Sequence, residues 1–281
     1  MAETSDGQLY VVKFVNNPQG ANLAFNECMG SELYSAFGLS GPAWTPLLVT
    51  DSFLDKNPAS WMQTPDGPLR PASGLCFGSR FLGGNDTRLL EILPGTSFKR
   101  VINHKTFWLA WLIDICARHA DNRQAVFLQQ GSGELQAFFI DHGHLFGGPK
   151  GGKQPHFIAS RYIDPRVYQN VSSPYLVNLK EGTRGLDVDR LWKRIQELPC
   201  EWATVSAAEN FAQCLDRLSN RNLVQNIVDT MVDAQQRTDE LECSKSRYGL
   251  PLADEVLRPR VLATKLGDCY VHSRARHPAC A

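Results

Sequence analysis

The middle of the chain predicts a β-hairpin that carries an acidic side chain at each of its two ends. An apolar helix over residues 103–118 leads into a polar loop that contains Asp121. Two apolar strands follow at 125–128 and 135–140, and Asp141 comes directly after the second strand. Because a hairpin brings the start of its first strand beside the end of its second, both carboxylates are predicted to lie in one site.

The composition is that of a globular chain without excess charge. The chain has 281 residues, of which 43% are apolar, so it is long enough for one two-lobed domain or two small domains. The chain has 29 basic residues (Lys and Arg) and 29 acidic residues (Asp and Glu). This balance of charge gives no argument for a nucleic-acid or membrane partner. The N-terminus does not resemble a signal peptide, and no apolar run is long enough to span a bilayer.

The cysteines argue for a reducing compartment. There are eight of them, and they are scattered without a C-x-x-C pair. Neither a cysteine-based zinc site nor a disulfide framework is therefore expected. We predict a cytoplasmic location.

The apolar periodicity predicts an α+β chain that is rich in strands first and in helices later. The expected strands are 8–15, 44–50, 74–81 and the hairpin, and the expected helices are 21–37, 103–118, 187–198 and 207–239. Residues 51–73 contain four prolines and are predicted to form a surface excursion, and Pro94-Gly95 is the expected hinge.

This order of elements is that of a two-lobed, protein-kinase-like fold. The predicted boundaries are a partial, β-rich N-lobe at 1–95, a helical C-lobe with the hairpin at 96–240, and a loosely attached tail at 241–281.

Phosphoryl transfer of the kinase type uses two carboxylates with different tasks, one that orients the attacking hydroxyl and one that holds Mg²⁺. Asp121, with Arg123 beside it, is the candidate catalytic residue, and Asp141 is the candidate Mg²⁺ ligand. Gln124 offers an amide oxygen to a second Mg²⁺, although the usual spacing would place this ligand at Val126. A helix-terminal role for Asp121 and a turn-forming role for Asp141 are the structural alternatives.

A lysine and a glutamate near the N-terminus occupy positions that need a charged partner. Lys13 lies inside an apolar strand, and Glu27 shares a face of the next helix with Leu23 and Tyr34. A lysine that contacts nucleotide phosphates and is positioned by Glu27 explains both residues, so we predict an ion pair between them. The alternative is an edge-strand lysine that faces water.

Three histidines, His119, His142 and His144, lie in the same loops as the two aspartates. They keep a metal-dependent hydrolase open as a weaker alternative. No H-E-x-x-H motif or helical 2-His-1-carboxylate pattern is present, however, so the histidines are expected to orient the loops.

Five short blocks, in this order, resemble the HipA-like kinases, and in particular a group of short bacterial HipA-like proteins. The blocks are YVVKFVNNPQ at 10–19, Asn26-Glu27, LCFGSRF at 75–81, ADNRQAVF at 120–127 and IDHG at 140–143. The resemblance covers residues 8–240. It implies a protein-kinase-like fold, ATP with Mg²⁺ as cofactor, and Ser/Thr phosphorylation of a protein acceptor.

Carried over by position, the resemblance makes Lys13 the nucleotide lysine, Asp121 the catalytic aspartate and Asp141 the metal ligand. Relatives have a glycine- and serine-containing segment before the lysine strand, whereas only Met1–Gln8 precede it here. The N-lobe is therefore expected to lack its first strands. A catalytically impaired, pseudokinase-like interaction module is the alternative to an active enzyme.

Overall fold

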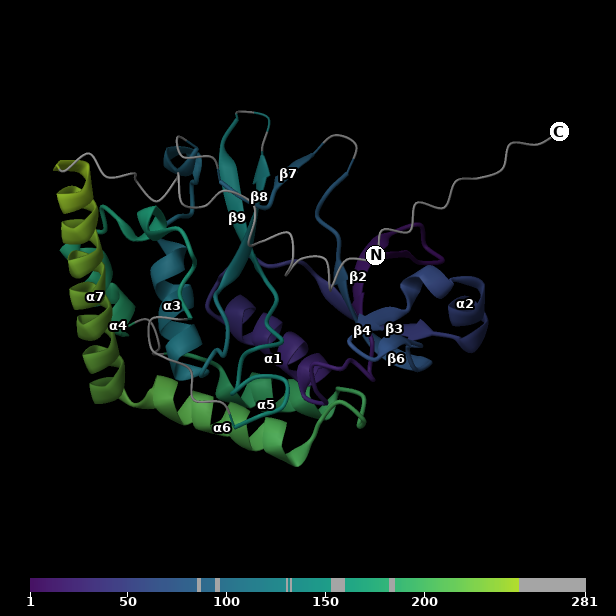
Figure 1. The fold of residues 1–281 in the computed structure, drawn as a ribbon. Coiled ribbons are helices and arrows are strands. Elements are labelled where there is room, and N and C mark those ends of the chain that lie inside the picture. The colour runs from purple at the N-terminus through teal and green to yellow at the C-terminus, as the bar shows by residue number, and fades with distance from the viewer. Residues whose placement is uncertain are drawn as a thin grey trace.

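The computed structural model describes residues 1–84, 87–93, 97–129, 131, 133–152, 160–181 and 185–247, without the side chains of 241–247. Within these residues the chain is mixed α+β, as expected, with seven α-helices and small antiparallel sheets. The N-terminal sheet lies on one side, the hairpin sheet stands over the centre, and most of the later helices lie on the other side and below (Figure 1). The predicted hinge at Pro94-Gly95 and the tail beyond Arg247 lie outside the described residues.

The N-terminal sheet has four antiparallel strands in the order β1-β2-β6-β3. The strands are β1 (Ala2–Glu3), β2 (Leu9–Lys13), β3 (Trp44–Val49) and β6 (Gly74–Arg80). Lys13 ends β2 and pairs with Phe77 of β6. The short strand β1 precedes the lysine strand and was not predicted from the sequence.

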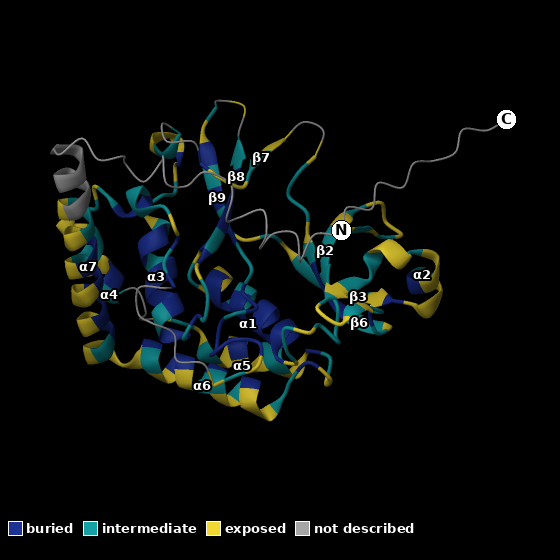
Figure 2. Cartoon of the chain, viewed as in Figure 1, coloured by how far each residue is buried: buried dark blue, intermediate teal, exposed yellow. Residues whose placement is uncertain are grey.

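Helix α1 (Leu23–Ala36) lies in the core between this sheet and the helical part of the chain. Ten of its 14 residues are buried, which Figure 2 shows as a mostly dark blue helix. It packs against β6 on one side and against α5 (Val188–Gln196) and α6 (Val205–Ser219) on others. One large apolar core therefore runs from Phe77 of the sheet through α1 into the later helices.

The predicted surface excursion at 51–73 folds into regular elements. It contains α2 (Asp51–Lys56), a 3-10 turn at Pro58–Ser60, and a hairpin of β4 (Met62–Thr64) and β5 (Gly67–Leu69). Leu54 of α2 packs with Val49 and Cys76 in a second, smaller core. Because Cys76 and Phe77 point to opposite faces of β6, the sheet is covered on both sides.

The central hairpin is confirmed. Strands β8 (Gln124–Gln129) and β9 (Leu135–Ile140) pair antiparallel with Gln124 opposite Ile140, and β7 (Arg88–Leu90) adds a third strand. Helix α3 (Thr106–Cys116) precedes the hairpin, and most of its residues, including Phe107 and Trp111, are buried. The hairpin register places the loops of Asp121 and Asp141 at the same end.

The long helix predicted at 207–239 is two helices, α6 and α7 (Arg221–Arg247). Asn220 between them has extended backbone angles, and its side-chain oxygen accepts a hydrogen bond from the backbone N–H of Leu223 at 3.1 Å. Asparagine favours this N-cap geometry over a helix interior, which explains the break. Helix α7 also packs against α4 (Ser173–Glu181), and it continues past residue 240, where the tail was expected to begin. Among the described residues, no helix combines the length and apolar character needed to cross a bilayer.

Candidate functional site

Three charged side chains from separate elements meet beside the end of the hairpin. Lys13 at the end of β2 forms an ion pair with Glu27 of α1, which confirms the predicted contact. The Lys13 Nζ atom also lies 2.6 Å from Asp141 Oδ1, just after β9. The Glu27 side chain is only 3% exposed, and those of Lys13 and Asp141 are 20% and 28% exposed. A largely buried charge cluster therefore joins the N-terminal sheet, α1 and the hairpin.

The backbone after the hairpin is shaped to reach Glu27. Asp141 adopts a left-handed φ of 59°, which turns the chain sharply. The next two backbone N–H groups, of His142 and Gly143, donate to the Glu27 carboxylate at 3.1 and 2.8 Å. A Cβ atom at Gly143 would lie 2.3 Å from Leu23 Cδ1 and 2.9 Å from Glu27 Oε1. Glycine is therefore required for this close approach.

The cluster holds one cation against two carboxylates. Burial would lower the pKa of Lys13, but the charges of Asp141 and Glu27 outweigh it and raise that pKa above its ordinary value. Burial would raise the pKa of Asp141, but Lys13 outweighs it and the pKa is lowered. For Glu27, burial is only partly offset by Lys13, so its pKa is raised. The cluster has an excess of negative charge, and a further cation would relieve it.

Asp121 lies in the loop at the same end of the hairpin. Its carboxylate is partly exposed and accepts a hydrogen bond from the backbone N–H of Asn122 at 2.8 Å. The backbone N–H of Ala120 donates to the carbonyl of His144 at 2.8 Å, which joins this loop to the one that follows Asp141. The two predicted aspartates thus sit on directly linked loops.

Gln124 begins β8 and contacts the predicted metal ligand directly. Its Nε2 atom donates to Asp141 Oδ2 at 2.9 Å. The structure therefore brings four of the six predicted site residues into one contact network: Lys13, Glu27, Gln124 and Asp141.

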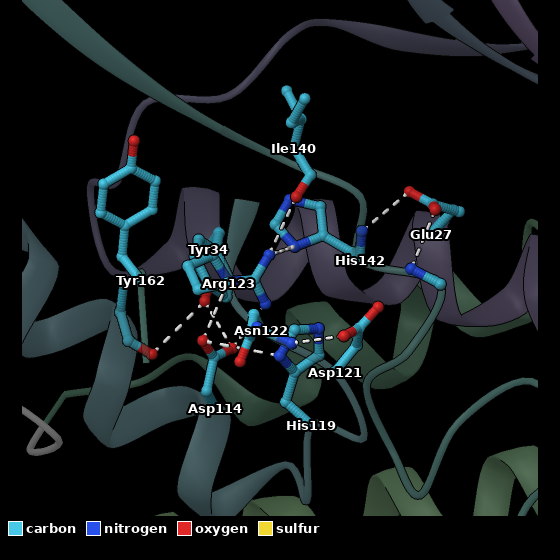
Figure 3. Close-up of polar contacts among 12 residues, drawn as sticks. Glu27, Tyr34, Asp114, His119, Asp121, Asn122, Arg123, Ile140, His142 and Tyr162 are labelled. Carbon is cyan, nitrogen blue, oxygen red and sulfur yellow. Dashed lines mark hydrogen bonds and ion pairs between the residues drawn. The ribbon is translucent and has the colours of Figure 1, made fainter. Parts of the chain in front are cut away.

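Arg123 forms a buried ion pair with an acidic residue of the preceding helix. Its side chain is 1% exposed and pairs with Asp114 of α3, with N–O distances of 2.5 and 2.9 Å. It also donates to the carbonyl of Ile140 at 3.0 Å, and Figure 3 shows it enclosed between these groups with Tyr34 beside it. Its guanidinium has no exposed face in this structure, and the catalytic role assigned to Arg123 from the sequence stays a prediction. Arg123 positions the loop of Asp121 relative to the end of β9.

Asp114 and Tyr34 complete this buried network and are not among the site residues predicted from the sequence. The Tyr34 hydroxyl donates to Asp114 Oδ1 at 2.6 Å, and the Arg123 guanidinium lies 4.8 Å from the centroid of the Tyr34 ring. A signal was present, because Asp114 is the sole charged residue of the otherwise apolar helix α3. A lone acid at such a position needs a buried partner.

Two of the three histidines, His119 and His142, lie in the interior. Burial, together with the charge of Arg123, lowers the pKa of both His119 and His142 well below the ordinary value. His142 Nδ1 lies 3.3 Å from an Arg123 nitrogen, and since a guanidinium only donates, this Nδ1 accepts. Across the described part of the chain, no group of three or more His, Cys, Asp or Glu side chains is arranged to hold a metal ion.

Comparison with protein-family models finds no match for this chain, and comparison with curated proteins finds none either.

Replacing Arg123 with methionine is expected to destabilise the protein strongly, because it leaves the buried Asp114 carboxylate without its cation. Losing one partner of a buried pair costs about 3–5 kcal/mol. The double variant Arg123→Met/Asp114→Leu removes both charges and is expected to recover most of this loss. Urea unfolding of the parent and both variants measures the difference.

The partly exposed arginine Arg70, which pairs with the exposed Asp51 and Asp55, provides the control. Arg70→Met is expected to change stability little, because exposed pairs contribute weakly. Equal losses of unfolding free energy in Arg70→Met and Arg123→Met would show that the buried pair contributes no more to stability than the partly exposed one.

Stability is expected to fall as the pH drops below about 6.5, the pKa of an unfolded histidine. Because the folded protein lowers the pKa of His119 and His142, the unfolded chain binds more protons below that pH. The contribution of His119 and His142 to the free energy of unfolding is therefore fully present above about pH 6.5. It is lost as the pH falls toward their pKa in the folded protein. Each histidine adds a slope of up to about 1.4 kcal/mol per pH unit.

Urea unfolding between pH 7.5 and pH 5.5, a window of about two units around the histidine pKa, measures this slope. His119→Asn removes one titrating group and should make the slope shallower than in the parent. Identical slopes would mean that His119 is not held neutral by the fold.

Proposed function

We propose that this chain is an ATP- and Mg²⁺-dependent phosphotransferase of the HipA-like kinase type, with a two-lobed, protein-kinase-like arrangement. The observation that carries the proposal is the contact of Lys13 with both Glu27 and Asp141. These residues come from a strand, a helix and the end of a hairpin, and they have the residue types and chain order that kinase chemistry requires.

In this proposal Glu27 is a fixed support for Lys13. The Glu27 carboxylate is held by two backbone N–H groups and is nearly fully buried, so it cannot follow the ligand. Lys13 has three donor hydrogens, and it turns from Asp141 to phosphate oxygens while keeping Glu27 as its partner. The phosphates thereby meet a cation whose position is already set.

Asp141 and Gln124 are the residues that would hold Mg²⁺. Their carboxylate and amide are hard oxygen donors, and the excess negative charge of the cluster favours a divalent cation. Mg²⁺ normally takes only one or two carboxylates, with phosphates and waters as its other ligands, so a cage of protein side chains is not needed. When bound, it would neutralise charge that develops on the phosphates.

Asp121 is the proposed catalytic residue. Its carboxylate is partly exposed, unlike that of Glu27, and its loop is hydrogen-bonded to the loop of Asp141. It would accept the hydrogen bond of an acceptor hydroxyl and orient the oxygen for attack. We propose a serine or threonine of a cytoplasmic protein as that acceptor.

One observation favours the interaction-module alternative. Gln124 turns an N–H group, and not an oxygen, toward Asp141. With Lys13 also on Asp141, both oxygens of this carboxylate have a partner within the protein itself. A module that kept the cluster only for stability would show this arrangement permanently.

Mg-ATP is expected to raise the melting temperature, because a ligand that binds only the folded state stabilises it. Asp121→Asn should keep this shift and lose phosphate transfer by orders of magnitude, since it removes the group that orients the acceptor. Asp141→Asn should lose both the shift in melting temperature and the phosphate transfer. Thermal denaturation, and transfer of labelled phosphate from ATP to the chain itself or to casein, measure the two properties.

Asp216→Asn on α6 is the matched control, because Asp216 is exposed and remote from the cluster in sequence and should leave both properties unchanged. Absence of any shift with millimolar Mg-ATP would reject nucleotide binding. A shift without transfer in the parent would favour the interaction module.

A further inference from the structure

A second acidic residue of α1 connects the helix to both of its neighbours. Glu32 lies five residues after Glu27, so it projects from a different side of α1. Its Oε1 atom accepts hydrogen bonds from Trp44 Nε1 of β3 and from Arg194 Nε of α5, each at 3.1 Å. The Arg194 guanidinium also lies over the Trp44 ring, 4.9 Å from its centroid. The N-terminal sheet, α1 and α5 are thus joined at the carboxylate of Glu32.

Other contacts attach the sheet and the start of α1 to the segment just before α6 and to the loop after the hairpin. Trp202, which is 1% exposed and lies just before α6, donates from its indole nitrogen to the carbonyl of Leu75 in β6 at 3.0 Å. At the start of α1, Asn22 Oδ1 accepts from the Thr204 hydroxyl at 2.7 Å, and the Asn22 backbone N–H donates to Pro149 at 2.9 Å. A rotation or shift of α1 would have to break contacts at its beginning and along its length.

We propose that Glu32, Trp44 and Arg194 form a clamp that fixes α1 to the N-terminal sheet and to α5, and so holds Glu27 against Lys13 in one position with or without nucleotide. The part that concerns nucleotide rests on the proposed function. The three residues are positioning residues, because none of them contacts Lys13 or Asp141 in the described network. The charged cluster is therefore assembled before a ligand arrives.

Hydrogen exchange of the backbone amides of α1 tests the clamp directly. In the parent protein, exchange over residues 23–36 is expected to be slow and to change little when Mg-ADP is added. Arg194→Ala removes the ion pair and the ring contact, and should accelerate exchange in α1 by roughly tenfold. Mg-ADP should then slow exchange in the variant, because binding selects the assembled helix position.

Three further variants separate the clamp from general damage to α5. Arg194 also pairs with Glu197 at 2.7 Å, so Glu197→Gln removes that contact alone and should leave α1 unchanged. Arg190→Ala replaces an exposed arginine of the same helix and should also have no effect. Arg194→Lys keeps the charge but loses the planar contact with Trp44, and should give partial rescue.

Two results would overturn the clamp. One is parent-like exchange of α1 in Arg194→Ala, and the other is a strong slowing of α1 exchange in the parent on addition of Mg-ADP. If the parent fails to bind Mg-ADP at all, the proposed function fails, while the comparison of ligand-free parent and variant still decides whether the clamp exists.

Discussion

The carboxylate of Glu27 lies in the protein core, and its need for partners connects three parts of the chain. A buried, unpaired carboxylate is strongly disfavoured, so its position selects Lys13 from the first sheet and two backbone N–H groups from the turn after the hairpin. Those partners are available only if β2, α1 and the end of β9 converge. The same convergence places Asp141 beside Lys13. The candidate site is thus also the place where these three elements are joined.

A second buried network contacts the same turn after the hairpin. Asp114, Arg123 and Tyr34 satisfy one another in the interior, and Arg123 also holds the carbonyl of Ile140 at the end of β9. His142 links the two networks, because its backbone N–H donates to Glu27 while its ring accepts from Arg123. The turn that carries Asp141 is therefore held from two sides. Such fully partnered networks favour a single arrangement of a site over several.

The hairpin and the central helices could be predicted because their signals are local. Strand β9 has the bounds expected for it, and α1 and α3 differ from their predicted ranges by a few residues at the ends. The break at Asn220 was missed because the apolar spacing continues across it, while the cap depends on backbone angles. The prolines of residues 51–73 predict a surface excursion, yet Leu54 packs with Val49 and Cys76 in a core on one face of the sheet. Such a core depends on residues far apart in the chain.

The sequence by itself determined which residues needed partners. A lysine within an apolar strand, a glutamate on an apolar helix face and an aspartate at the end of an apolar strand each carry a charge where burial is expected. The pair of Lys13 with Glu27 could be predicted from the sequence. Only the tertiary structure decided the other pairings: it joined Lys13 to Asp141 as well, turned Arg123 inward to Asp114, and attached α1 to its neighbours through Glu32. The physical reason is that pairing depends on distance in space, and chain order limits that distance only over short separations.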